Sequence, residues 1–173
     1  MFKRILVALN KSLEASAVLD SALSMSQPES ELLLLHFIDW QMQEVSPWIG
    51  LGTLYDIDLS GDRYDWSRQR LYQEVEICNM WLKTLAEKVR RRNNISCDYN
   101  CCVGNCNLGI AERARKWSAD LIIVGRRGHR NISEIFLGSV SNYVIHHAPC
   151  SVLVAQSSQS LLETEILADE VEV

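Results

Sequence analysis

Residues 119–148 read ADLIIVGRRGHRNISEIFLGSVSNYVIHHA, and the order of their patterns decides the fold. A short apolar run, Leu121 to Val124, ends at Gly125 and predicts a buried strand. A basic glycine segment follows, and an amphipathic helix is expected to open at Gly138 and Ser139. Glycine lets the backbone approach a phosphate closely, and a helix N-terminus carries unpaired N–H donors. This stretch therefore predicts an anion-binding loop between a strand and a helix.

The rest of the chain supplies the remaining elements of one α/β domain, expected to span residues 1–155. Further strands are predicted at 3–9, 31–38, 95–103 and 151–155, and helices at 13–26, 66–92, 108–118 and 139–147. Ser12 is expected to cap the first helix. Strand, helix and strand in so few residues form a parallel, right-handed unit. The order predicts an open five-stranded parallel sheet with helices on both faces and ligands at its carboxyl edge, where the strands end.

Two segments lie outside this pattern. Residues 39–65 are longer than a normal connection and fit either a mobile surface loop or a lid over a ligand. The tail 156–173 carries five acids and no Lys or Arg, so a flexible tail is expected. Without the tail, residues 1–155 hold 17 basic and 17 acidic groups. A neutral body gives no general electrostatic reason to bind nucleic acid.

Composition and motifs exclude several classes of protein. No apolar run reaches the roughly 18 residues of a membrane span, and the N-terminal run is too short for a signal peptide, so we expect a cytoplasmic protein without membrane contact. The six cysteines lack zinc-ligand spacing, and no metal site or catalytic constellation is expected. The pattern G-x4-G-K-[ST] is absent, as is G-x-G-x2-G after the first strand. These absences argue against a Walker-type NTPase and a dinucleotide oxidoreductase.

The chain resembles the universal stress proteins, and within them the ATP-binding subgroup. The motif of that subgroup, G-x2-G-x9-G-(S/T), reads GRRGHRNISEIFLGS over residues 125–139. The stretches KRILVAL, LLLLHFID, SADLIIVGRRG and HAPCSVLV also resemble family segments, so the likeness covers residues 1–155 apart from the long loop. The resemblance implies a flavodoxin-like or Rossmann-like fold of the adenine nucleotide alpha hydrolase type, binding of ATP or AMP, and a homodimer through the last strand, 151–155.

The resemblance also implies which residues line the nucleotide site. Gly125, Gly128, Gly138 and Ser139 match phosphate and ribose contacts, and Phe37 matches the position whose backbone meets adenine. His129 is either a ligand contact or a solvated loop residue. The full set expected to bind the nucleotide is Ala8, Asn10, Phe37, Val124, Gly125, Arg126, Arg127, Gly128, His129, Arg130, Gly138, Ser139 and Val140.

Two departures from the family pattern concern a metal. Asn10 stands where the family usually has Asp, and Asn105 stands where it often has Asp. Asparagine keeps a hydrogen-bonding carbonyl but loses the charge that attracts Mg²⁺ to a triphosphate. We therefore expect nucleotide binding to survive, with weakened Mg²⁺ dependence and weakened hydrolysis.

Three functions remain open at this point. The first is a stress-response regulatory module whose conformation or dimerisation is tuned by ATP or AMP. The second is a slow ATP-hydrolysing enzyme, which needs a positioned water, charge stabilisation and usually a metal. The third is an interaction module with an empty site. The glycine motif argues against the third, and the two asparagines favour binding over hydrolysis; the protein partner is left open.

Overall fold

The computed structural model describes residues 2–12, 14–39, 62–93, 95–126 and 137–156. The interior of the predicted loop (40–61), the tail from 157 and part of the glycine loop (127–136) lie outside the described residues. The elements run in the order β1 Arg4–Ala8, α1 Ala15–Met25, β2 Glu31–Ile38, α2 Asp62–Asn93, β3 Ser96–Val103, α3 Cys106–Trp117, β4 Leu121–Gly125, α4 Ser139–His147 and β5 Ser151–Ala155.

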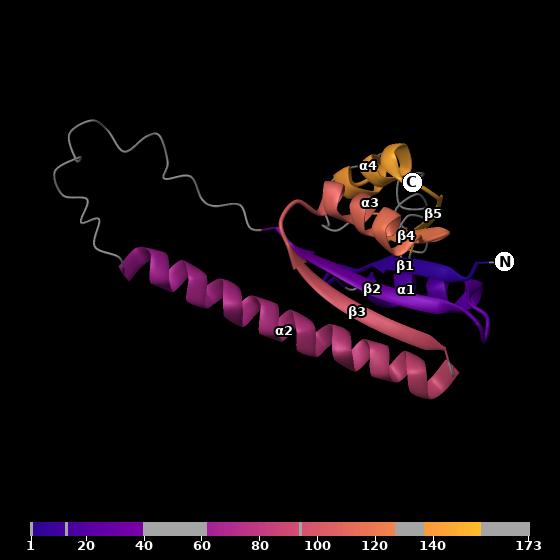
Figure 1. The fold of residues 1–173 in the computed structure, drawn as a ribbon, viewed down its shortest axis with the longest axis horizontal. Helices are drawn as coiled ribbons and strands as arrows, with labels where there is room; N and C mark the ends of the chain where they lie inside the picture. Colours follow the sequence, from indigo (N-terminus) through magenta and orange to yellow (C-terminus); the bar gives the residue numbers. More distant parts are fainter. Residues whose placement is uncertain (1, 13, 40–61, 94, 127–136, 157–173) are drawn as a thin grey trace, which may run out of the picture.

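The five strands form one parallel sheet in the order β3-β2-β1-β4-β5. Strand β1 lies at the centre, with Ile5 opposite Leu32 of β2 and Leu121 of β4. The chain winds outward from β1 through β2 to β3, and then returns across the sheet to β4 and β5. Figure 1 shows α2 on one side of the sheet and α3 with α4 on the other. The predicted fold class is confirmed.

Alternate side chains of the strands enter two apolar clusters, one on each face of the sheet. In β1, Ile5 and Val7 belong to the cluster that includes buried residues of α1 and α2, whereas Leu6 belongs to the cluster under α3 and α4. This alternation is the period of an extended strand, and the continuous apolar runs of β1, β2 and β4 reflect burial on both faces. The sheet is therefore a rigid support for the loops at its carboxyl edge.

The boundary of α2 differs from the sequence prediction. It begins at Asp62, four residues before the predicted start at 66. Its buried residues are confined to the second half, from Cys78 to Val89, among the side chains described. In the sequence the apolar residues at three- and four-residue steps begin only at Leu71, so periodicity does not mark the start of the helix.

The start of α1 also differs from the prediction. Glu14, rather than Ser12, occupies the N-cap position, and no side chain makes a capping hydrogen bond there. Ser12 Oγ instead donates to Asn10 Oδ1 over 2.7 Å and accepts from the Glu14 N–H over 3.3 Å. The hydroxyl of Ser12 thus stabilises the turn between β1 and α1 and does not cap the helix.

Of the helices that the structure describes, none combines the length and the apolar character that crossing a membrane would take.

Candidate functional site

Those predicted site residues that the structure describes converge on the carboxyl edge of the sheet. Ala8, the last residue of β1, and Val124, the last buried residue of β4, are direct neighbours in the strand register. Winding of the sheet reverses direction between these two strands, and in open α/β sheets ligands bind at the carboxyl ends of strands at such a switch point. The topology therefore places the candidate site beside Ala8 and Val124.

An apolar surface adjoins this switch point. Ala8, Phe37, Val124 and Val140 all belong to the cluster between the sheet and the α3–α4 layer. They come from three strands and from the first turn of α4. Ala8, Phe37 and Val140 are partly exposed and Val124, only 2% exposed, lies beneath them; we call these four the carboxyl-edge surface. Apolar lining with a few placed polar groups is the usual composition of a small-molecule site. Four residues predicted separately from sequence are thus brought to one face of the sheet.

The two ends of the glycine loop are fastened to each other and to the sheet. The Arg126 N–H donates to the Ala155 carbonyl over 2.9 Å, and the Gly138 N–H donates to the Arg126 carbonyl over 2.9 Å. Gly138 occupies the N-cap position of α4 and offers no side chain to cap the helix. The loop consequently returns to its own starting point, and the N-terminus of α4 lies beside the end of β4.

Ser141 lies beside the candidate site and was not among the residues predicted from sequence. Its side chain is 3% exposed, and its hydroxyl donates to the Gly125 carbonyl over 2.6 Å. The Arg126 carbonyl lies 3.4 Å from the same hydroxyl. The signal available in sequence was a polar residue on the buried face of α4, three positions before the buried Val144. Ser141 holds the first turn of α4 against the start of the glycine loop.

The two asparagines that stand at expected metal positions are engaged in local turns. Asn10 Oδ1 accepts from the Ser12 hydroxyl, as described above. Asn105 is the N-cap of α3, and its side-chain oxygen accepts from the Leu108 N–H over 3.2 Å. Both residues are neutral, and both oxygens already serve a turn or a helix start. They do not fit a site whose affinity depends on Mg²⁺ coordination.

No group of three His, Cys, Asp or Glu side chains suited to hold a metal ion occurs in the described part of the chain.

His36 supports the edge from the opposite face of the sheet. Its Nδ1 lies 2.7 Å from the Leu9 carbonyl, so Nδ1 carries the hydrogen, and its ring meets Trp81 of α2 edge-on at 5.7 Å. Burial lowers the pKa of His36, its hydrogen bond to Leu9 acts in the opposite direction, and the charge of Lys11 lowers the pKa further. His36 thus joins the ends of β1 and β2 to α2, as expected for a structural histidine.

The remaining predicted residues divide into two groups. Gly125, Arg126, Gly138 and Ser139 are described and flank the loop at β4 and α4. The others, Arg127, Gly128, His129 and Arg130, lie outside the described residues.

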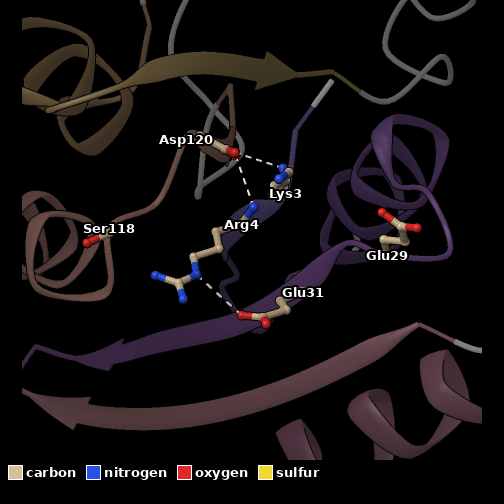
Figure 2. Close-up of a pocket in the computed structure, with 6 residues that line it drawn as sticks. All are labelled: Lys3, Arg4, Glu29, Glu31, Ser118 and Asp120. Carbon is tan, nitrogen blue, oxygen red and sulfur yellow. Dashed lines mark hydrogen bonds and ion pairs between the residues drawn. The ribbon is translucent and has the colours of Figure 1, made fainter.

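A pocket of about 340 Å³ lies at the other end of the sheet. Figure 2 shows its lining, in which Asp120 accepts from the Lys3 N–H over 2.7 Å and the Arg4 N–H over 3.1 Å. The Arg4 side chain reaches Glu31 at 3.4 Å and the Trp117 carbonyl at 3.3 Å. These charged groups tie the start of β1 to β2 and to the α3–β4 connection. The pocket is therefore far from the carboxyl edge, and its polar groups serve the fold.

Comparison with known families and proteins agrees with this architecture. The model of the universal stress protein family matches residues 1–156. The universal stress protein Sll1388 of Synechocystis sp. is 34% identical over 156 residues, which cover 90% of this chain and 98% of the relative.

Solved structures share the fold. The protein MJ0577 superposes with a TM-score of 0.72 at 22% identity, covering 91% of this chain and 98% of its own. A universal stress protein in complex with cAMP superposes with a TM-score of 0.56 at 17% identity, and the match covers 89% of this chain and 96% of that protein. The Arabidopsis thaliana protein At3g01520, with AMP bound, superposes with a TM-score of 0.57 at 16% identity, and the match covers 91% of this chain and 94% of that protein. With the family model spanning nearly all of the described fold, this chain belongs to the universal stress protein family.

Proposed function

We propose that this universal stress protein binds an adenine nucleotide, ATP or AMP, at the carboxyl edge between β1 and β4, and acts as a regulatory binding module in a stress response. The observation that carries the proposal is the convergence of the carboxyl-edge surface with the fastened ends of the glycine loop. An aromatic base suits the apolar surface, and a phosphate suits the N-terminus of α4 at Gly138 and Ser139.

Charge and composition support the same arrangement. The loop carries Arg126, Arg127, His129 and Arg130, whereas the rest of residues 1–155 holds 14 basic and 17 acidic groups. Cations and glycine backbone beside a helix N-terminus stabilise a phosphate group. Two neighbouring folds, described above, hold cAMP and AMP, which supports adenine as the base.

Binding without dependence on Mg²⁺ is part of the proposal. The carboxylates that would hold Mg²⁺ beside a triphosphate are replaced by Asn10 and Asn105, whose oxygens already accept hydrogen bonds. Hydrolysis would need a positioned water and stabilisation of the charge that develops on the phosphate, usually by a metal. We therefore place slow ATP hydrolysis second.

We further propose that the regulated state is a homodimer formed through β5, residues 151–155. Strand β5 ends the sheet, and an exposed edge strand pairs readily with another chain. The loop start is joined to this strand, because the Arg126 N–H donates to the Ala155 carbonyl. A nucleotide that binds one arrangement of the loop more tightly would thereby favour one dimer state. A cytoplasmic location remains a prediction from the sequence.

Calorimetric titration of the pure chain with ATP and with AMP tests the proposal. Binding is expected for at least one of them, and Gly138→Val should abolish it by placing a branched side chain at the loop end. The Gly138 backbone has φ −59° and ψ 156°, which valine adopts, so the variant should fold. Ser24→Ala, on the exposed side of α1, is the matched control and should bind as the parent does. If neither ATP nor AMP binds the parent chain, by calorimetry or by a thermal shift, the proposal is wrong.

A further inference from the structure

Phe37 and Gly109 make an unusually close contact between the sheet and α3. A Cβ placed on Gly109 would lie well inside 3.0 Å of the Phe37 Cζ and Cε1 atoms, and 3.2 Å from Cδ1. Real Cβ atoms do not approach other heavy atoms so closely. The ring of Phe37 therefore occupies the space where any other residue at 109 would carry its side chain.

Local conformation does not explain a glycine at this position. Gly109 lies inside α3, and its N–H donates to the Asn105 carbonyl over 3.0 Å as a helical amide does. A glycine in a helix interior is less favourable than alanine. The left-handed glycine of the described chain is Gly104, with φ 131°, so Gly109 is not needed for a turn. Space for the Phe37 ring is the remaining physical reason.

Phe37 lies at the part of the carboxyl-edge surface where we expect the base of the nucleotide to bind. It lies near the end of β2, is half-buried, and belongs to the carboxyl-edge surface with Ala8, Val124 and Val140. A partly exposed aromatic ring can stack on a planar base or meet its edge, which a smaller aliphatic group does less well. The ring position against α3 thus decides what the surface offers to a ligand.

We propose that Gly109 is a positioning residue of the nucleotide site, which seats the Phe37 ring against α3 so that its exposed side receives an aromatic base. This inference rests on the proposed function. A side chain at 109 would push the ring away from α3. Phe37 packs against the buried cluster of the α3–α4 face, and a close-packed core leaves no room there, so the ring would move toward solvent, over the surface that the base needs.

A rescue experiment tests the inference. Gly109→Ala should weaken ATP binding about tenfold, equivalent to ~1.4 kcal/mol, because overpacking of this size displaces the ring. Phe37→Leu alone should weaken it about threefold through loss of the aromatic contact. In the double variant, leucine lacks atoms equivalent to Cζ and Cε1, so affinity should return to the level of Phe37→Leu. Arg115→Ala, an exposed position on the same helix, is the control and should bind as the parent does.

The outcomes separate this inference from the proposed function. A parent chain that binds neither ATP nor AMP overturns both. A parent that binds ATP, with Gly109→Ala binding it equally well, overturns the role of Gly109 alone. If the single variant does not fold, the double variant must fold and bind like Phe37→Leu. A double variant that remains as impaired as Gly109→Ala also overturns the inference, because a general helix defect would not be relieved by a smaller residue at 37.

Discussion

The hydroxyl of Ser141 donates to the carbonyl of Gly125 over 2.6 Å and so joins the first turn of α4 to the last residue of β4. This bond crosses the base of the glycine loop. A second bond, from the Gly138 N–H to the Arg126 carbonyl, runs beside it. Together they hold the proposed phosphate site in place before a ligand arrives, which reduces the ordering cost of binding.

Ser141→Ala should therefore lower both stability and nucleotide affinity. The buried carbonyl of Gly125 would lose a partner, at a cost of about 1–2 kcal/mol in the free energy of unfolding. Urea denaturation measures this loss, and titration with ATP measures the affinity. Ser24→Ala removes an exposed hydroxyl bonded within α1 and should change neither quantity. Equal effects of the two substitutions would contradict the role given to Ser141.

Asn105 provides a test of the metal argument. Asn105→Asp keeps an oxygen for the Leu108 N–H and restores the carboxylate of the family pattern, so ATP binding should become more dependent on Mg²⁺. Asn105→Ala removes the cap and should cost about 1 kcal/mol of stability. The measurement is ATP titration with Mg²⁺ and with a chelator. A strict Mg²⁺ requirement in the parent chain would contradict our interpretation of both asparagines.

The lowered pKa of His36 predicts that the folded chain loses stability as the pH falls. Its pKa in the folded chain is lowered from the usual 6.5, mainly by burial, so the unfolded chain binds more protons between the two pKa values. The contribution of neutral His36 is fully present above about pH 6.5 and is lost as the pH falls through the folded pKa. Urea denaturation at a series of pH values should show this fall.

His36→Gln is the variant that isolates this effect, because glutamine keeps an N–H donor for the Leu9 carbonyl and does not titrate. Its stability should fall less than that of the parent between pH 7.5 and 5.5. Ser24→Ala, which removes an exposed hydroxyl that does not titrate in this range, should leave the pH profile of the parent unchanged. Parallel profiles for parent and His36→Gln would rule out His36 as the source.

The buried cysteines should be slow to react. Burial raises the pKa of Cys78 and of Cys97 to about 12, and the hydrogen bond that the Cys78 thiol makes with Cys101 adds to the effect at Cys78. At neutral pH both groups stay as thiols, and the thiolate is the reactive form. Alkylation of the folded chain followed by mass spectrometry should leave these two unmodified until denaturant is added. Rapid labelling of either in the folded state would contradict their placement in the core.

The fold was predictable because its strands are buried on both faces. Continuous apolar runs at 31–38 and 121–124 identify central strands without knowledge of their neighbours. The apolar steps of α2 begin only at Leu71 in the sequence, so the start of the helix was placed four residues late. The cap of α1 was misplaced for a similar reason, since Ser12 can serve either a helix or a turn and the hydroxyl is used in the turn.

The candidate site can be proposed from the sequence where it depends on local spacing, and not where it depends on contacts between distant elements. The glycine spacing identifies Gly125, Gly138 and Ser139 within a single stretch. The contact of Phe37 with Gly109 joins β2 to α3, 72 positions apart in the chain, and no local pattern marks it. Ser141 was readable as a polar residue on a buried face, but its partner at Gly125 required the structure.

Calorimetric titration of ATP and AMP into the parent chain and into Gly138→Val tests the central claim most directly. The account predicts saturable binding of at least one nucleotide to the parent, with or without Mg²⁺, and no binding to a folded Gly138→Val. Binding to neither form, or equal binding to both, would contradict a nucleotide site formed by the glycine loop and the N-terminus of α4.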